Sequence, residues 1–174
     1  MWHAFLDESR RGSTYLVAMV IARPRDLDRT RTALRAKVKP GQRRLHFYKE
    51  SDSRRKEIVA LLHDLGVRAR IFTCEHPNDR AARRLCLTAA GTHLINISAV
   101  RLVLESCAHQ DADDRHTLAL VKRKIFVLDH EHFRPHEDPM LWASDAIAWS
   151  HGAGGDWRRR VAGLVEAVHQ VKVP

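Results

Sequence analysis

Two acidic positions far apart in the chain stand in apolar surroundings that would hold them rigidly. Asp145 is the only charged residue between Met140 and Ser150, and Asp7 and Glu8 directly follow the apolar run Ala4 to Leu6. A carboxylate that loses water needs a cation, hydrogen bonds or a metal ion in its place. Because hard divalent cations bind oxygen ligands on rigid elements, these positions predict a Mg²⁺ or Mn²⁺ site.

The acids Asp7 and Glu8 are consecutive, so in a regular strand their side chains point to opposite faces. Asp7 shares its face with Phe5 and is the preferred ligand, while Glu8 is a further candidate for the metal. If two ions bind, Asp7 is expected to bridge them. The alternative is structural: Asp7 closes a turn, and Asp145 pairs with one of the many arginines.

The composition favours one basic domain covering residues 1–174. Thirty Lys and Arg against 21 Asp and Glu give a net charge of +9, which favours phosphate-rich partners. The three cysteines lack the spacing of a zinc or redox motif, and no leader-like or membrane-spanning stretch is present. We therefore expect a cytoplasmic protein with reduced thiols that does not bind membranes.

The apolar pattern predicts an α/β layer fold with a mixed central sheet. Antiparallel strands come first and crossover units follow, and acids at the ends of strands lie where such sheets bind ligands. A Ser51 or Asp52 cap predicts a helix that Gly66 ends, and Asp138-Pro139 predicts the start of the Asp145 helix. Strands are expected at residues 2–6, 15–22, 44–48, 67–73 and 125–129, and further helices at 25–39, about 79–107 and from 156 onward.

Three short motifs resemble those of the bacterial domain-of-unknown-function 3800 family, in the same order. Phe5-Leu6-Asp7-Glu8-Ser9 is similar to its opening "DES" strand, Arg44 to Phe47 to its "lHf" strand, and Leu141 to Ala148 to its "LqlADliA" helix. That family is regarded as RNase H-like. The resemblance implies a mixed sheet of about five strands flanked by helices, and metal-dependent phosphodiester chemistry.

The resemblance also implies a third acid from the middle of the chain. Glu75 follows the strand at 67–73, and Asp129 ends the strand expected at 125–129, so these two are the main candidates. Glu50 and Glu57 are others. His46 lies on the "lHf" strand, where two interpretations stay open: it orients a water molecule or contacts phosphate, or it is a structural histidine.

Basic residues near these acids are the expected contacts to nucleic acid. Arg10 and Arg11 follow Asp7 directly, Lys49 lies beside His46, and Arg54 begins the next helix. The partner is expected to be RNA or DNA. The sequence leaves open whether the protein forms a homodimer. Few aromatic residues are available, so base stacking on an aromatic platform is not expected.

The sequence therefore predicts a nuclease that uses Mg²⁺ or Mn²⁺ held by Asp7 and Asp145, with Glu75 or Asp129 as the third acid. Two alternatives stay open. A degenerate RNase H-like domain would bind nucleic acid or a protein without cutting. A toxin ribonuclease would use the same chemistry for another purpose.

Overall fold

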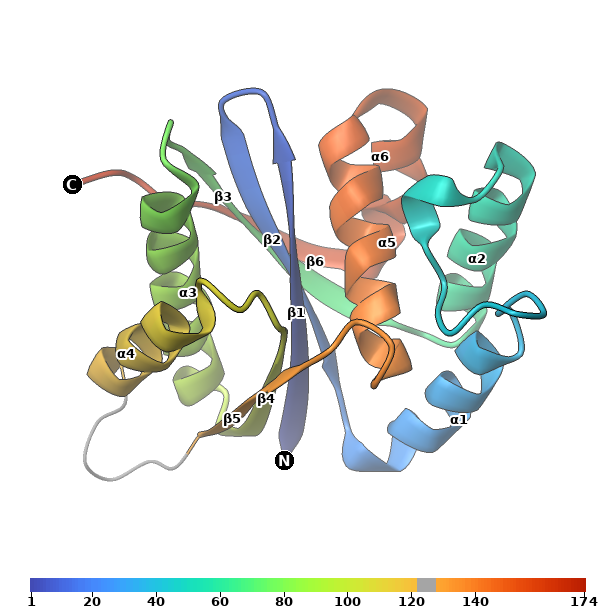
Figure 1. Ribbon diagram of the computed structural model, residues 1–174, viewed down its shortest axis with the longest axis horizontal. Coiled ribbons are helices and arrows are strands. Elements are labelled where there is room, and N and C mark those ends of the chain that lie inside the picture. Colours follow the sequence, from blue (N-terminus) through green and yellow to red (C-terminus); the bar gives the residue numbers. More distant parts are fainter. Residues whose placement is uncertain (122–127) are drawn as a thin grey trace.

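A six-stranded mixed sheet forms the centre of the computed structural model, which describes residues 1–121 and 128–174 (Figure 1). The strand order is β5-β4-β1-β2-β3-β6. β1 pairs antiparallel with β2 and parallel with β4, so β1 lies inside the sheet. The strands are β1 Trp2–Arg11, β2 Thr14–Ala22, β3 Arg68–Glu75, β4 Ala99–Glu105, β5 Asp129–Phe133 and β6 Val165–Gln170.

Helices cover both faces of the sheet (Figure 1). α5 packs on β1 and β2 on one face, together with α1, α2 and α6, and α3 and α4 pack together on the other face. The helices are α1 Pro24–Arg35, α2 Asp52–Asp64, α3 Asp79–Asn96, α4 Asp111–Val121, α5 Pro139–Ala153 and α6 Gly155–Val161, with 3₁₀ turns η1 Phe47–Lys49 and η2 Ala162–Leu164.

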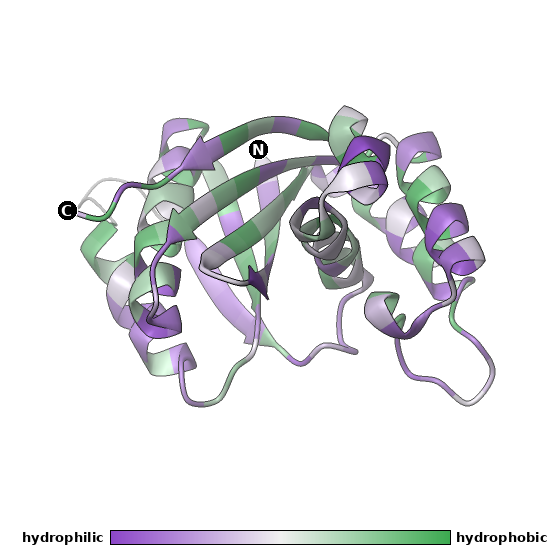
Figure 2. Ribbon diagram, turned by 90° about the horizontal axis from the view of Figure 1, so that it is seen from above, coloured by the Kyte–Doolittle hydropathy of each residue, from purple (hydrophilic) through white to green (hydrophobic). Residues whose placement is uncertain are grey.

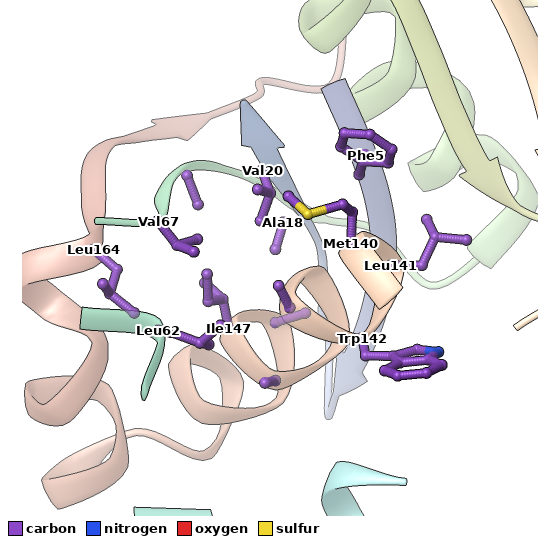
Figure 3. Packing of buried hydrophobic residues seen from close by; sticks show 14 of the residues in the cluster. Phe5, Ala18, Val20, Leu62, Val67, Met140, Leu141, Trp142, Ile147 and Leu164 are labelled. Atoms are coloured by element: carbon purple, nitrogen blue, oxygen red, sulfur yellow. The ribbon is translucent and has the colours of Figure 1, made fainter. Parts of the chain in front are cut away.

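The alternation of side chains along β1 divides the core into two layers. Phe5 is buried with Met140 and Ile147 of α5, as Figure 3 shows, whereas Leu6 is buried with residues of α3 such as Leu87. Hydrophobic residues concentrate in the central strands, and hydrophilic ones in the outer helices and loops (Figure 2). The residue after Leu6 therefore faces α5, and the next one faces α3.

Several elements begin and end as the sequence predicts. Ser51 caps α2, because its hydroxyl accepts a hydrogen bond from the Arg54 N–H. The Asp138 carboxylate accepts from the Met140 N–H and caps α5, whose first residue is Pro139. None of the helices in the described part of the chain has the length and apolarity needed to cross a membrane.

The strand expected at 44–48 is wrong. Residues 44–46 have no regular structure, and Phe47 to Lys49 form η1. Phe47 is nevertheless buried against Trp149 and Trp157, with ring centroids 5.5 and 6.3 Å apart. The apolar residues that suggested a strand instead fix this turn against α5 and α6.

The long helix expected at 79–107 is also wrong, because α3 ends at Asn96. Ser98 has a positive φ of 55° and reverses the chain into β4. β4 then pairs with β1 and β5, so its apolar residues are buried by the sheet. A strand thus replaces the last turns of the expected helix.

The end of the chain differs as well. The helix expected from 156 onward stops at Val161, and Val165 begins β6, which pairs parallel with β3. Of the strand expected at 125–129, residues 125–127 lie outside the described residues, and Asp129 begins β5 instead of ending a strand. Among the described residues the sheet therefore has six strands instead of about five.

Candidate active site

Two carboxylates lie side by side where the parallel strands β1 and β4 end. Leu6 pairs with Leu104, so Asp7 and Glu105 are the next residues on neighbouring strands, which are about 4.8 Å apart. Asp7 shares the face of Phe5, and Glu105 shares that of Val103, both of which belong to the core layer under α5. Both carboxylates therefore face α5.

Helix α5 brings a third carboxylate to this edge of the sheet. The Ser144 hydroxyl, fully buried, donates a hydrogen bond of 2.8 Å to the Phe5 carbonyl of β1. Asp145 is the next residue, and its neighbours Ala143, Ala146 and Ile147 are all buried. Because most of the helix surface is apolar and buried, α5 fixes Asp145 relative to β1.

Backbone and arginine groups hold the acids in place. The Glu8 N–H donates to Asp7 Oδ1 over 2.8 Å, and the Phe47 N–H of η1 donates to the Asp145 carboxylate. Arg44 Nη1 lies 3.8 Å from Glu105 Oε2. Asp145 has no ion pair within 4.0 Å among the described residues, so the alternative in which an arginine neutralises it directly does not apply there.

The three acids repel one another in a poorly hydrated place. Burial and the charges of Glu8, Glu105 and Asp145 raise the pKa of Asp7 well above its usual range, and Asp7 is only 7% exposed. Burial raises the pKa of Glu105 to about 7, although Arg44 opposes the rise. Burial likewise raises the pKa of Asp145 to about 6, against the Arg44 charge and the Phe47 N–H.

These shifts predict that the metal-free protein loses stability as the pH rises. A carboxyl with a raised pKa in the folded state binds more protons folded than unfolded, so the folded state is disfavoured as pH increases through that interval. For Glu105 the interval runs from its usual 4.5 to about 7 and corresponds to about 3 kcal/mol. Urea unfolding in chelator should show wild type losing stability relative to Glu105→Gln between about pH 5 and pH 8. Parallel pH profiles of the two proteins would contradict the raised pKa of Glu105.

Glu8 points to the other face of the sheet, as the alternation along β1 requires. Its Oε2 lies 2.7 Å from Nη1 of Arg83 on α3. Arg83 is 2% exposed and donates two hydrogen bonds of 2.8 Å to Asp114 on α4. Glu8 therefore anchors a buried ion-pair network, although its charge still raises the pKa values of Glu105 and Asp145.

A second group of potential ligands belongs to this network. Asp111, Asp114 and His132 have ligand atoms within 4.8 Å of one another, and they form the only such group in the described part of the chain. The carboxylate oxygens of Asp7, Glu105 and Asp145 are therefore more widely spaced than this. His132 Nε2 lies 3.0 Å from Asp114 Oδ2. Both Asp114 oxygens already accept from Arg83, which favours an ion-pair role over a metal site.

The two expected third acids lie away from Asp7. Asp129 begins β5 and pairs with Arg101 of β4, which in turn pairs with His3 of β1. Asp129 therefore lies about four residues, or 13 Å, before Asp7 along the direction of the strands. Glu75 ends β3, two strands from β1, and its carboxylate accepts from the Ser13 and Thr14 hydroxyls. The premise that Asp129 ends a strand is wrong, and neither acid joins the cluster.

The expected basic contacts are mostly engaged by the protein itself. Arg10 Nε lies 2.9 Å from Asp79, and Arg11 stacks 5.3 Å from the Trp149 ring centroid. Arg54 donates to the Lys37 carbonyl and pairs with Glu50, which also binds Lys39.

Two other expected functional residues lie in η1 or directly before it. His46 directly precedes Phe47, whose N–H binds Asp145, and Lys49 is exposed at the end of η1. Burial and the charges of Arg44 and Lys49 lower the pKa of His46.

Sequence reasoning missed Glu105. The stretch Val100 to Leu104 fits the continuation of a helix when only apolar spacing is counted. It is nevertheless a short, largely apolar run followed directly by an acid, Glu105, just as Ala4 to Leu6 is followed by Asp7. Ile97-Ser98 provides the break before it. The acid directly after a short apolar run was therefore the signal that could have identified Glu105 from the sequence.

Comparisons with known proteins identify the fold. No family model matches the chain, and no curated protein sequence matches it. A chain of the PCNA:RNase HII complex from Archaeoglobus fulgidus is 17% identical, with a TM-score of 0.56 over 93% of this chain and 75% of that one. Ribonuclease H2 from Pyrococcus horikoshii OT3 is 12% identical, with a TM-score of 0.55 over 94% of this chain and 75% of that one. Membership of the domain-of-unknown-function 3800 family stays a prediction, and the chain has an RNase H-like fold.

Proposed function

We propose that this protein is a metal-dependent nuclease that hydrolyses nucleic-acid phosphodiester bonds. The observation that carries the proposal is the convergence of Asp7, Glu105 and Asp145 at one edge of the sheet, with raised pKa values and without an equal number of neighbouring cations. Likeness to solved RNase HII and ribonuclease H2 structures supports it. The strongly basic composition suits a polyanionic substrate.

The donor set fits a hard divalent cation. All three side chains offer carboxylate oxygens, which suit Mg²⁺ and Mn²⁺ better than thiol or imidazole does. Clustered acids that resist ionisation gain the most when a cation compensates their charges. Asp7, Glu105 and Asp145 would hold the cation, which would polarise the phosphodiester and make water a stronger nucleophile.

The chain's own groups orient these acids. The Glu8 N–H fixes one oxygen of Asp7, the Phe47 N–H fixes Asp145, and Arg44 restrains Glu105. The Ser144 hydroxyl ties α5 to β1 immediately beside Asp145. These contacts limit how far each carboxylate can turn, which is the preorganisation that catalysis needs. We also propose that residues 1–174 act as one domain, because both core layers share the same sheet.

A cleavage assay tests this function. Purified protein should cut at least one of four labelled substrates, single- and double-stranded RNA and DNA, when Mg²⁺ or Mn²⁺ is present, and chelator should stop the reaction. The same panel decides between RNA and DNA. Absence of cleavage on all four substrates with either metal would contradict the proposal.

A domain that binds nucleic acid without cutting is the second candidate. It is favoured by the spacing of the acids, since the oxygens of the Asp7 cluster do not all lie within 4.8 Å of one another. Glu105 beside Asp7 provides a third acid, which counts against this candidate. Binding of a labelled substrate without metal-dependent cleavage would support this candidate.

A further inference from the structure

A basic cavity of about 450 Å³ includes Arg44, which also lies beside Glu105 of the acid cluster. Its walls come from the loop before η1, from η1 itself and from the loop between β5 and α5. The basic residues that line it are Arg43, Arg44, His46, Lys49 and His136, and none of its lining residues is acidic.

Two arginines that line the cavity pair with histidines and not with acids from the cavity wall. Arg43 Nη2 lies 2.9 Å from His136 Nε2, and Arg44 Nε donates to His46 Nε2 over 3.1 Å. Because a guanidinium only donates hydrogen bonds, both imidazole nitrogens act as acceptors. Among the described residues, no carboxylate lies within 4.0 Å of Arg43 or Lys49. Arg43 and Lys49 thus line the cavity with positive charge that no neighbouring carboxylate compensates.

The cavity and the acid cluster share a wall. Arg44 lines the cavity and also lies 3.8 Å from Glu105. His46 lines it too, and the next residue, Phe47, donates to Asp145. A strand whose phosphodiester lies at the acids therefore has a neighbouring phosphate close to these cations.

The walls are fixed before any ligand arrives. The Trp142 indole N–H of α5 donates to the Pro135 carbonyl over 2.6 Å. Arg31 Nη2 lies 2.6 Å from the Asp138 carboxylate, which also caps α5. The first contact holds the loop that carries His136 against the helix that carries Asp145, and the second ties the end of that loop to α1. Such preorganisation reduces the entropic cost of binding an anion.

We propose that this cavity binds a phosphate group of the nucleic-acid strand, adjacent to the phosphodiester that the three acids address. The inference rests on the proposed function for its substrate class. Arg43, Lys49 and His136 contact the phosphate, and Arg44 lies between the phosphate and Glu105. The cavity thereby sets the register of the strand at the acids without reading its sequence.

Binding measurements without catalysis test the cavity. In full-length Asp145→Asn protein with chelator, Arg43→Gln and His136→Gln should each weaken the binding of a fluorescent single-stranded oligonucleotide about tenfold, and Arg43→Gln should reduce the salt dependence by about one charge. The control is Arg115→Gln, an exposed arginine on α4 across the sheet, which should bind like the parent. Lys49→Gln provides a third variant outside the arginine–histidine pairs.

Two further arms identify the source of the phosphate. If the cavity takes a terminal phosphate, a 5′-phosphorylated oligonucleotide binds more tightly than its 5′-hydroxyl form, and Arg43→Gln removes the difference. If it takes a backbone phosphate, both forms weaken equally. Unchanged binding in the Arg43, Lys49 and His136 variants would overturn the proposal, as would equal competition by poly-glutamate. If these variants lose binding but the wild-type protein cleaves no substrate, the phosphate site is supported and the proposed nuclease activity is contradicted.

Discussion

Replacing Asp145 by Asn should reduce metal-dependent cleavage by roughly two orders of magnitude or more, since even outer-shell changes at metal sites cost 10–100-fold. The substitution keeps the shape of the side chain and removes a carboxyl group, whose pKa burial raises to about 6. Folding should therefore be retained or improved. The measurement is the initial cleavage rate on the best substrate, with Mg²⁺ and with Mn²⁺.

Asp129→Asn is the matched control for this prediction. It makes the same chemical change at an exposed aspartate about 13 Å back along the strand direction, where β5 begins. It should cleave like wild type. Millimolar metal should raise the melting temperature of wild type and Asp129→Asn more than that of Asp145→Asn, because a ligand of the folded state stabilises it. Full activity in Asp145→Asn would remove this residue from the mechanism.

Replacing Arg83 by Met should destabilise the fold by about 3–5 kcal/mol, the usual cost of removing one partner from a buried ion pair. Arg83 is 2% exposed and forms ion pairs with both Glu8 on β1 and Asp114 on α4. Burial alone would raise the pKa of Asp114, but the hydrogen bonds from Arg83 and His132 lower it. Removing the arginine leaves two carboxylates facing each other with His132 as their remaining partner in the network. Urea denaturation at neutral pH measures the loss.

Arg80→Met is the control, because Arg80 lies one turn earlier on α3 and pairs with Asp113 of the same α4. Arg80 is exposed, so solvent screens its ion pair and the melting temperature should barely change. Equal stability of Arg83→Met and Arg80→Met would show that the Glu8–Arg83–Asp114 network contributes little. Restored stability in an Arg83→Met, Asp114→Asn double variant would support the repulsion as the cause.

The sequence by itself determines the local features of this protein. An apolar segment with one internal charge identifies Asp145, and Asp138-Pro139 fixes where its helix begins. The alternation at Phe5, Leu6 and Asp7 assigns Asp7 to the face of Phe5. These signals are readable because capping, periodicity and a strand's two faces depend on neighbours within a few residues.

Only the tertiary structure decides which acid joins Asp7 and Asp145. Glu105 reaches the site because β4 pairs parallel with β1, and this pairing joins residues almost a hundred positions apart. The same apolar stretch fits a helix locally, and only the sheet makes it a strand. Asp129 looked equivalent along the chain, but its strand begins where β1 also begins, at the opposite edge. Long-range strand pairing therefore selects the site, since the direction and register of a strand are set by partners that local sequence does not specify.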